Sequence, residues 1–184
     1  MPDSLAELHR QLGIPSEYGR VRGLNRQVEA ELSELVAAGG SPDRPIYLAQ
    51  PAAQGWHDLR QTAFKTGLDL RLLSGFRSIA RQMEILQGKL RSGQSLNAIL
   101  RVNAAPGYSE HHIGRAVDIG CPGSPPFEES FSETPAFEWL MAHGPSFGFH
   151  LSYPRNNPHG LCYEPWHWLW RPEAVAEAAN KSLE

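Results

Sequence analysis

Hydrophobic positions in the first 70 residues recur mainly at the three- and four-residue spacing of an amphipathic helix. A capping box at Ser4 opens the first of these patterns, and Gly13 follows its last apolar position. A Gly-Gly pair follows the second pattern and Pro51 lies early in the third, as expected of helix ends and starts. We therefore expect helices over residues 4–13, 27–38 and 51–67, a loop over 15–23 and a short strand over 46–48. The apolar positions expected to face a core include Leu5, Leu8 and Leu12, then Val28, Leu32, Leu35 and Val36, and then Trp56, Leu59, Ala63 and Phe64.

In the rest of the chain, alternating apolar and polar residues, typical of strands, are mixed with helical patterns. Breaker residues over 154–160 separate two strand-like segments and predict an antiparallel hairpin. The three aromatic rings Trp166, Trp168 and Trp170 share one parity in its second arm, which favours a hydrophobic wall over a sugar-stacking platform. We expect strands over 68–74, 115–119, 147–153 and 161–170, helices over 78–90, 95–102 and 134–144, and a short helix from 171 onward.

Length and charge narrow the class of protein. The 184 residues fall within the usual size of one domain, so we expect a single domain over residues 1–184. A net charge of -3 and the absence of a basic run give no electrostatic case for nucleic acid. No apolar run reaches the about 20 residues that a membrane helix needs, and the first residues lack a signal-peptide pattern. A cytoplasmic protein is therefore expected, or a periplasmic or cell-wall-facing one if a leader peptide has been removed.

Two cysteines, Cys121 and Cys162, are too few for a disulfide scaffold. The simpler interpretation is two small buried residues. Since each lies near a candidate metal ligand, a disulfide between them is the alternative, and it would indicate an oxidising compartment.

The segment from Ser109 to Asp118 carries the first candidate chemistry. It holds two adjacent histidines and then an alternating stretch that places Ala116 and Asp118 on one face of a strand. Histidine and aspartate suit Zn²⁺, and a catalytic zinc usually takes three protein ligands and leaves one position for water. A third ligand is best sought in residues 163–168, where Pro165 excludes a helical metal motif. We predict a kink or bulge there that turns Glu164 and His167 toward the same point.

Three blocks together resemble a known family. They are Ser74-Gly-Phe-Arg-Ser78, Ser109-Glu-His-x-x-Gly-x-Ala-x-Asp118 and Glu164-Pro-Trp-His167, which occur in this order between about residues 68 and 170. They resemble the zinc D-alanyl-D-alanine carboxypeptidases and dipeptidases associated with vancomycin resistance, whose fold hedgehog signalling domains and phage endopeptidases share. The resemblance implies an α+β fold with a small antiparallel sheet flanked by helices, and one Zn²⁺ on the sheet. The helical segment expected over residues 1–45 precedes this core.

The resemblance also implies roles for residues. It makes His111, Asp118 and His167 the zinc ligands, Glu164 the general base and Arg77 the electrophilic helper. The candidate substrate contacts are Gln82, Tyr108, Ser109 and Tyr153, although Gln82 could equally face solvent.

The implied reaction is removal of the terminal D-alanine from a peptidoglycan stem peptide by metal-activated water. L,D-carboxypeptidase, dipeptidase and endopeptidase activities remain alternatives, because the metal site does not fix which residues flank the bond. A zinc-binding module without turnover, as in hedgehog domains, is the alternative from another class. The sequence leaves the oligomeric state open.

Some residues depart from the family pattern. His112-Ile113 replaces a common Gln-Thr, Ser152 stands where many relatives have Arg, and Leu169-Trp170 replaces Arg-Tyr. We expect these changes to affect the pocket wall and substrate preference rather than the metal. His112 is expected to line the entrance or to bond a carboxylate near the metal.

Overall fold

The computed structural model describes residues 4–172, and its centre is a four-stranded antiparallel sheet. The order of the strands is β3-β4-β6-β5, so two segments far apart in sequence lie next to one another in the middle. All five residues of β4 are buried, as expected for a central strand between packed layers. The strands span Arg71–Ser74 (β3), Ala116–Gly120 (β4), Phe149–Leu151 (β5) and His167–Trp170 (β6). The expected α+β fold with a small antiparallel sheet is confirmed.

Helices pack on this sheet to form the larger of two cores. Helix α3 (Gln50–Lys65) contributes Trp56, Leu59 and Ala63, which are buried as the periodicity predicts. Helix α6 (Pro135–His143) contributes Leu140 to the same core. Phe64 is 72% exposed, so its predicted inward orientation is wrong.

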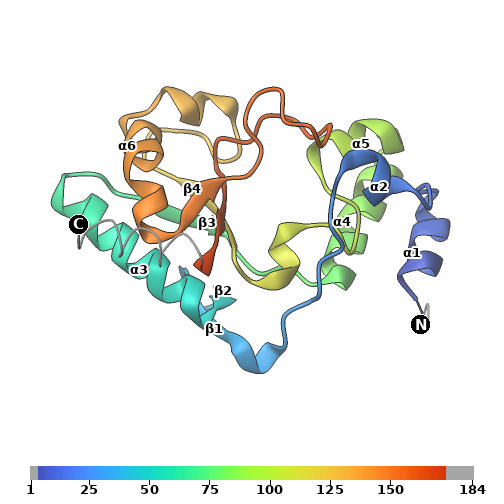
Figure 1. The fold of residues 1–184 in the computed structure, drawn as a ribbon, viewed down its shortest axis with the longest axis horizontal. Coiled ribbons are helices and arrows are strands. Elements are labelled where there is room, and N and C mark those ends of the chain that lie inside the picture. Colours follow the sequence, from blue (N-terminus) through green and yellow to red (C-terminus); the bar gives the residue numbers. More distant parts are fainter. Residues whose placement is uncertain (1–3, 173–184) are drawn as a thin grey trace.

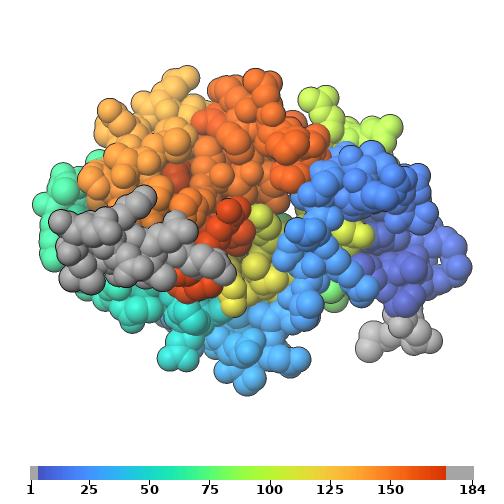
Figure 2. Space-filling model, viewed as in Figure 1, coloured from blue at the N-terminus to red at the C-terminus, as the bar shows by residue number. Residues whose placement is uncertain are grey.

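A second core joins the remaining helices. These are α1 (Leu5–Leu12), α2 (Tyr18–Arg22), α4 (Ile79–Arg91) and α5 (Leu96–Val102). Ser4, Ser78 and Ser95 cap α1, α4 and α5 with their side chains, as expected. In Figure 1 these helices lie on the opposite side of the molecule from α3 and α6. In Figure 2 the blue N-terminal segment and the orange C-terminal segment flank the residues drawn in yellow, near residue 115.

The predicted helix over residues 27–38 is wrong. Its second half forms an antiparallel hairpin, β1 (Leu35–Ser41) with β2 (Arg44–Ala49). Its first half is extended, and its backbone N–H groups bond to distant carbonyls: Gln27 to Gly107 (2.8 Å) and Ala30 to His112 (2.8 Å). Because these long-range bonds satisfy the backbone, the helical stripe is not needed, and Val28 and Leu32 are 81% and 78% exposed.

Smaller differences concern the loops and the ends. Residues 15–23, predicted as a loop, contain α2, whose Tyr18 hydroxyl accepts a bond from the backbone N–H of Ala105. Both cysteines are free, so the alternative of a disulfide is wrong. The short helix expected from 171 onward lies almost wholly outside the described residues. Among residues 4–172, no helix is long and apolar enough to span a membrane. Short 3₁₀ turns cover Leu32–Glu34 (η1), Glu110–Ile113 (η2), Glu129–Glu133 (η3) and Gly144–Phe147 (η4).

Candidate metal centre and catalytic pocket

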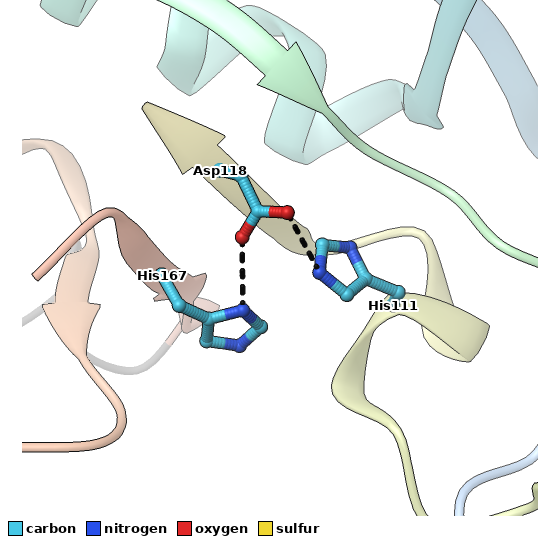
Figure 3. A group of neighbouring side chains, drawn as sticks. All are labelled: His111, Asp118 and His167. Carbon is cyan, nitrogen blue, oxygen red and sulfur yellow. Dashed lines mark hydrogen bonds and ion pairs between the residues drawn. The ribbon is translucent and has the colours of Figure 1, made fainter. Parts of the chain in front are cut away.

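The three predicted metal ligands meet at the centre of the sheet. Asp118 on β4 is paired in register with His167 on β6, and His111 lies on η2, the turn that leads into β4. Asp118 Oδ2 lies 3.3 Å from His111 Nε2, and Asp118 Oδ1 lies 3.1 Å from His167 Nδ1 (Figure 3). One ligand atom from each residue lies within 4.8 Å of the others, and all three residues are buried.

The donor atoms of this group fit one zinc ion. His111 Nδ1 donates a hydrogen bond to the Gly75 carbonyl at 2.6 Å, which leaves the lone pair of Nε2, on the side of Asp118, available to a metal ion. On His167, Nε2 lies 3.0 Å from the Glu110 carboxylate, so Nδ1 is the nitrogen that would bind a metal ion. Two imidazole nitrogens and one carboxylate oxygen are a donor set that suits zinc. Each imidazole also has the outer hydrogen bond that is usual for histidine ligands.

Electrostatics also favour a cation at this point. Burial lowers the pKa of His111, so this ring is neutral near pH 7. Although burial opposes it, the two neighbouring imidazoles hold the pKa of Asp118 well below its usual range. Burial would also lower the pKa of His167, but Asp118 and Glu110 raise it to about 10. The buried Asp118 carboxylate thus remains ionised here, with the charged His167 ring and Arg77 beside it, and a zinc ion would replace the proton on His167 Nδ1 as the neighbouring positive charge.

Glu164 reaches the same point from a turn rather than from a bulge in a strand. The His167 N–H bonds to the Glu164 carbonyl (3.1 Å), and β6 begins only at His167. This turn brings Glu164 Oε2 to 3.9 Å from His167 Nδ1, so both side chains face the metal centre, as the expected irregularity requires. Burial, aided by Asp118 and Glu110, raises the pKa of Glu164 to about 7 against the opposing effect of His167 and Arg77.

Arg77 lies beside the metal ligands and is fixed by Gln82. Its Nη2 lies 4.0 Å from Asp118 Oδ2, and its Nη1 donates to Gln82 Oε1 at 2.9 Å. Gln82 is only 1% exposed and donates its own N–H to the Ala104 carbonyl at 2.7 Å. The alternative that Gln82 faces solvent is therefore wrong, since its side chain bridges the arginine and the backbone.

The three candidate ligands, together with Glu164, Arg77 and Gln82, line one pocket of about 400 Å³. Ser109 and Tyr153 also line it, while Tyr108 does not and instead packs edge-on against Tyr18 (5.3 Å between ring centroids). The pocket also contains Lys89, Phe127 and Trp166. Trp166 contacts Phe127 edge-on in the pocket, and it also packs, partly buried, against the core that contains Trp168 and Trp170, in agreement with the predicted hydrophobic wall.

Two further contacts were not predicted from sequence. His112 is fully buried and neither lines the pocket nor bonds a carboxylate: its Nδ1 donates to the Arg77 carbonyl (2.6 Å) and its Nε2 accepts from the Gly107 N–H (3.0 Å). Ser152 lies outside the pocket wall and donates to Glu110 at 2.6 Å. Glu110 itself was missed as a site residue, although it lies directly before His111 in the quoted motif.

Comparison with known proteins places the chain in a family. Residues 45–173 match the family model of VanY, the D-alanyl-D-alanine carboxypeptidase. The bifunctional D-Ala-D-Ala dipeptidase and carboxypeptidase VanXYC of Enterococcus gallinarum is 32% identical over 142 residues, which cover 70% of this chain and 69% of that protein. A D-alanyl-D-alanine carboxypeptidase of Enterococcus faecalis is 29% identical, and the match covers 97% of this chain but only 61% of that protein.

Solved structures agree with this placement. The LdcB LD-carboxypeptidase aligns with a TM-score of 0.72 at 29% identity, over 86% of this chain and 80% of that one. The D,D-pentapeptidase VanY from the VanB-type resistance cassette, in complex with Zn(II), aligns at 0.63 and 25% identity over 88% and 92% of the two chains. VanYB in complex with D-alanine-D-alanine aligns at the same score and identity over 86% and 91%. With a family model that matches more than two thirds of its length, the chain belongs to the VanY family of D-alanyl-D-alanine carboxypeptidases.

Proposed function

We propose that this protein is a zinc-dependent carboxypeptidase that removes the terminal D-alanine from peptidoglycan stem peptides. The observation that carries the proposal is the meeting of three ligands, one carboxylate and one guanidinium in a single pocket. The substrates named for VanXYC and for VanYB support the choice of D-Ala-D-Ala.

His111, Asp118 and His167 would hold the zinc ion. When bound, the ion supplies a Lewis acid that makes water a competent nucleophile near neutral pH. The protein contributes a fixed set of donor atoms, because β4 and β6 are hydrogen-bonded in register at Asp118 and His167.

Glu164 is the proposed general base. Its carboxylate lies in the pocket beside His167. Among the described residues that line the pocket, the other carboxylate is Asp118, which is a proposed metal ligand. Glu164 takes a proton from the attacking water and delivers it to the nitrogen of the departing D-alanine. No serine or cysteine nucleophile is required.

Arg77 and Lys89 supply the positive charge of the pocket. Arg77, oriented by Gln82, is the donor that stabilises the oxyanion formed at the scissile carbonyl. Lys89 lines the same pocket, and its side-chain ammonium group makes no hydrogen bond or ion pair within residues 4–172. An unpaired cation in the pocket supports a substrate that ends in a free carboxylate.

The test is release of D-alanine from an acyl-D-Ala-D-Ala peptide, with zinc content measured on the same samples. We expect Glu164→Ala to retain zinc and lose turnover, and His111→Ala to lose both. Glu138→Ala, an exposed carboxylate on α6, is the matched control and should behave as the parent. Near-normal turnover in Glu164→Ala would remove it from the role of base. A fully zinc-loaded protein that is inert toward every stem peptide offered would refute the whole proposal.

L,D-carboxypeptidase activity is a second candidate, because the alignment with the LdcB LD-carboxypeptidase has the higher TM-score of the three solved structures described above. Assays on pentapeptide and tetrapeptide stems decide between the two, since only an L,D enzyme removes the last residue of the tetrapeptide. For either activity we propose that the protein acts on the wall-facing side of the membrane, where mature stem peptides are found. Cell fractionation with an antibody against the protein tests this.

A further inference from the structure

Glu110 contacts the more distant of the two ligand histidines. It precedes His111 in the chain, yet its Oε2 lies 3.0 Å from Nε2 of His167, which is 57 residues away. Ser152, the residue after β5, donates its hydroxyl to the same oxygen at 2.6 Å. The Glu110 side chain is only 17% exposed and that of His167 only 4%, so the pair is shielded from water.

We propose that Glu110, held by Ser152, is a positioning residue that fixes the ring orientation and tautomer of His167 for metal binding. The proposal rests on the zinc dependence proposed above. A neutral imidazole carries one proton, and a metal can bind only the nitrogen that lacks it. A carboxylate can only accept, so when a metal takes the place of the proton on Nδ1, Glu110 would keep the ring's remaining proton on Nε2.

The alternative tautomer would be harmful in this site. Asp118 Oδ1 lies 3.1 Å from His167 Nδ1, and Glu164 Oε2 lies 3.9 Å from the same atom. If the neutral ring kept its one proton on Nδ1, the hydrogen bond that Nδ1 makes with Asp118 in this structure would persist, and two of the three proposed metal ligands would satisfy each other. Among the described residues, the recorded partner of Nε2 is Glu110 alone, so this carboxylate opposes that state.

The two histidine ligands are therefore oriented by different means. His111 uses a backbone carbonyl, that of Gly75, which no side-chain substitution removes. His167 is oriented by the Glu110 side chain, which is itself held by the hydroxyl of Ser152, the residue after β5. The backbone N–H of Ser152 also bonds to the His167 carbonyl (3.3 Å), so the strand pairing itself places the hydroxyl beside Glu110.

The test compares zinc affinity in Glu110→Gln, Ser152→Ala and the parent, by competition with a chromophoric chelator at fixed pH. Glutamine preserves the size of the side chain, but its amide can turn an N–H toward Nε2 and favour the wrong tautomer. We expect zinc to bind about 10–100-fold more weakly in Glu110→Gln and to a smaller degree in Ser152→Ala. Added zinc should restore most of the turnover of both variants, unlike that of Glu164→Ala.

Glu138→Gln, an exposed charge-matched change on α6, is the control and should bind zinc as the parent does. Circular dichroism and melting of the metal-free proteins report whether each variant folds, and Ser152→Ala decides if Glu110→Gln does not. Folded variants with zinc affinity within about twofold of the parent would overturn this role for Glu110. A parent that binds no zinc would instead overturn the proposed function, so the two failures are distinguishable.

Discussion

Replacing Gly75 by alanine should damage both the fold and the metal centre. Gly75 follows β3 and lies directly against the β1–β2 hairpin. A Cβ at this position would lie 2.5 Å from the Tyr47 carbonyl oxygen, 2.8 Å from Ile46 Cγ2 and 2.9 Å from Leu48 Cδ2. The Gly75 carbonyl also accepts the bond from His111 Nδ1 at 2.6 Å.

The size of the effect follows from these contacts. Ordinary van der Waals contact of a Cβ begins at 3.4 Å, so the approach to Tyr47 falls short by 3.4 − 2.5 = 0.9 Å. Since the nearest atom is backbone, the two segments must separate. Overpacking of this kind costs about 1–3 kcal/mol, which lowers Tm by about 2–12 °C in a chain of this length. The separation also moves the carbonyl that orients His111, so zinc affinity should fall about 10–100-fold.

The assay is thermal melting by circular dichroism together with zinc competition, on Gly75→Ala and on a matched control. Gly88 is the control, because it lies inside α4 and a Cβ there meets no atom within 4 Å. Gly88→Ala should stabilise the protein by about 0.5–1 kcal/mol, since glycine is unfavourable in a helix, without changing zinc affinity. If Gly75→Ala melts at or above the parent temperature with unchanged zinc affinity, the close approach is not a constraint and the reasoning fails.

Three further predictions concern the pocket. Arg77→Met should lower kcat by about 10²–10³-fold, whereas an effect confined to KM would make Arg77 a substrate anchor instead. Gln82→Leu leaves the buried Ala104 carbonyl and one N–H of Arg77 without the partners that Gln82 provides. We expect the free energy of unfolding, measured in urea, to fall by about 1–3 kcal/mol, and kcat to fall as well. If both values were unchanged, the bridging role of Gln82 would be wrong. Removing zinc with a chelator should lower Tm, because the ion binds only the folded site, and added zinc should restore it; a Tm that does not respond to zinc would show that the ligands do not meet in solution.

The site could be predicted from sequence because its residues lie in short blocks with fixed spacing. Alternation placed Asp118 on one face of its strand and Pro165 excluded a helical metal motif, while the resemblance to the family implied His111, Asp118 and His167 as the ligand set. The pairing of Asp118 with His167 required the three-dimensional register of β4 and β6. Helices with a clear cap, such as those opened by Ser4 and Ser78, were also correct.

The failures occur where long-range contacts compete with a local pattern. Residues 27–38 have helical spacing, but periodicity records only which positions could share a face and not whether a core lies beside them. Here the backbone N–H groups of Gln27 and Ala30 bond to residues about 80 positions away, and no local feature indicates those partners. The contact of Glu110 with His167 could not be predicted for the same reason, since the histidine next to Glu110 in sequence is His111 and not His167.

The adjacent histidines show how the site is held as one unit. His111 Nδ1 bonds to the Gly75 carbonyl and His112 Nδ1 bonds to the Arg77 carbonyl, both at 2.6 Å, while the Arg77 N–H bonds to the His111 carbonyl at 3.1 Å. Three hydrogen bonds thus join η2 to the turn that carries Arg77. The proposed metal ligand His111 and the proposed oxyanion donor Arg77 are therefore coupled in position, because the segment that carries one is hydrogen-bonded to the segment that carries the other. This gives His112, which is fully buried and does not line the pocket, a structural role beside the proposed ligand His111. The same bonds would hold Arg77 in place relative to a metal bound at His111, as a reaction in which both act on one carbonyl requires.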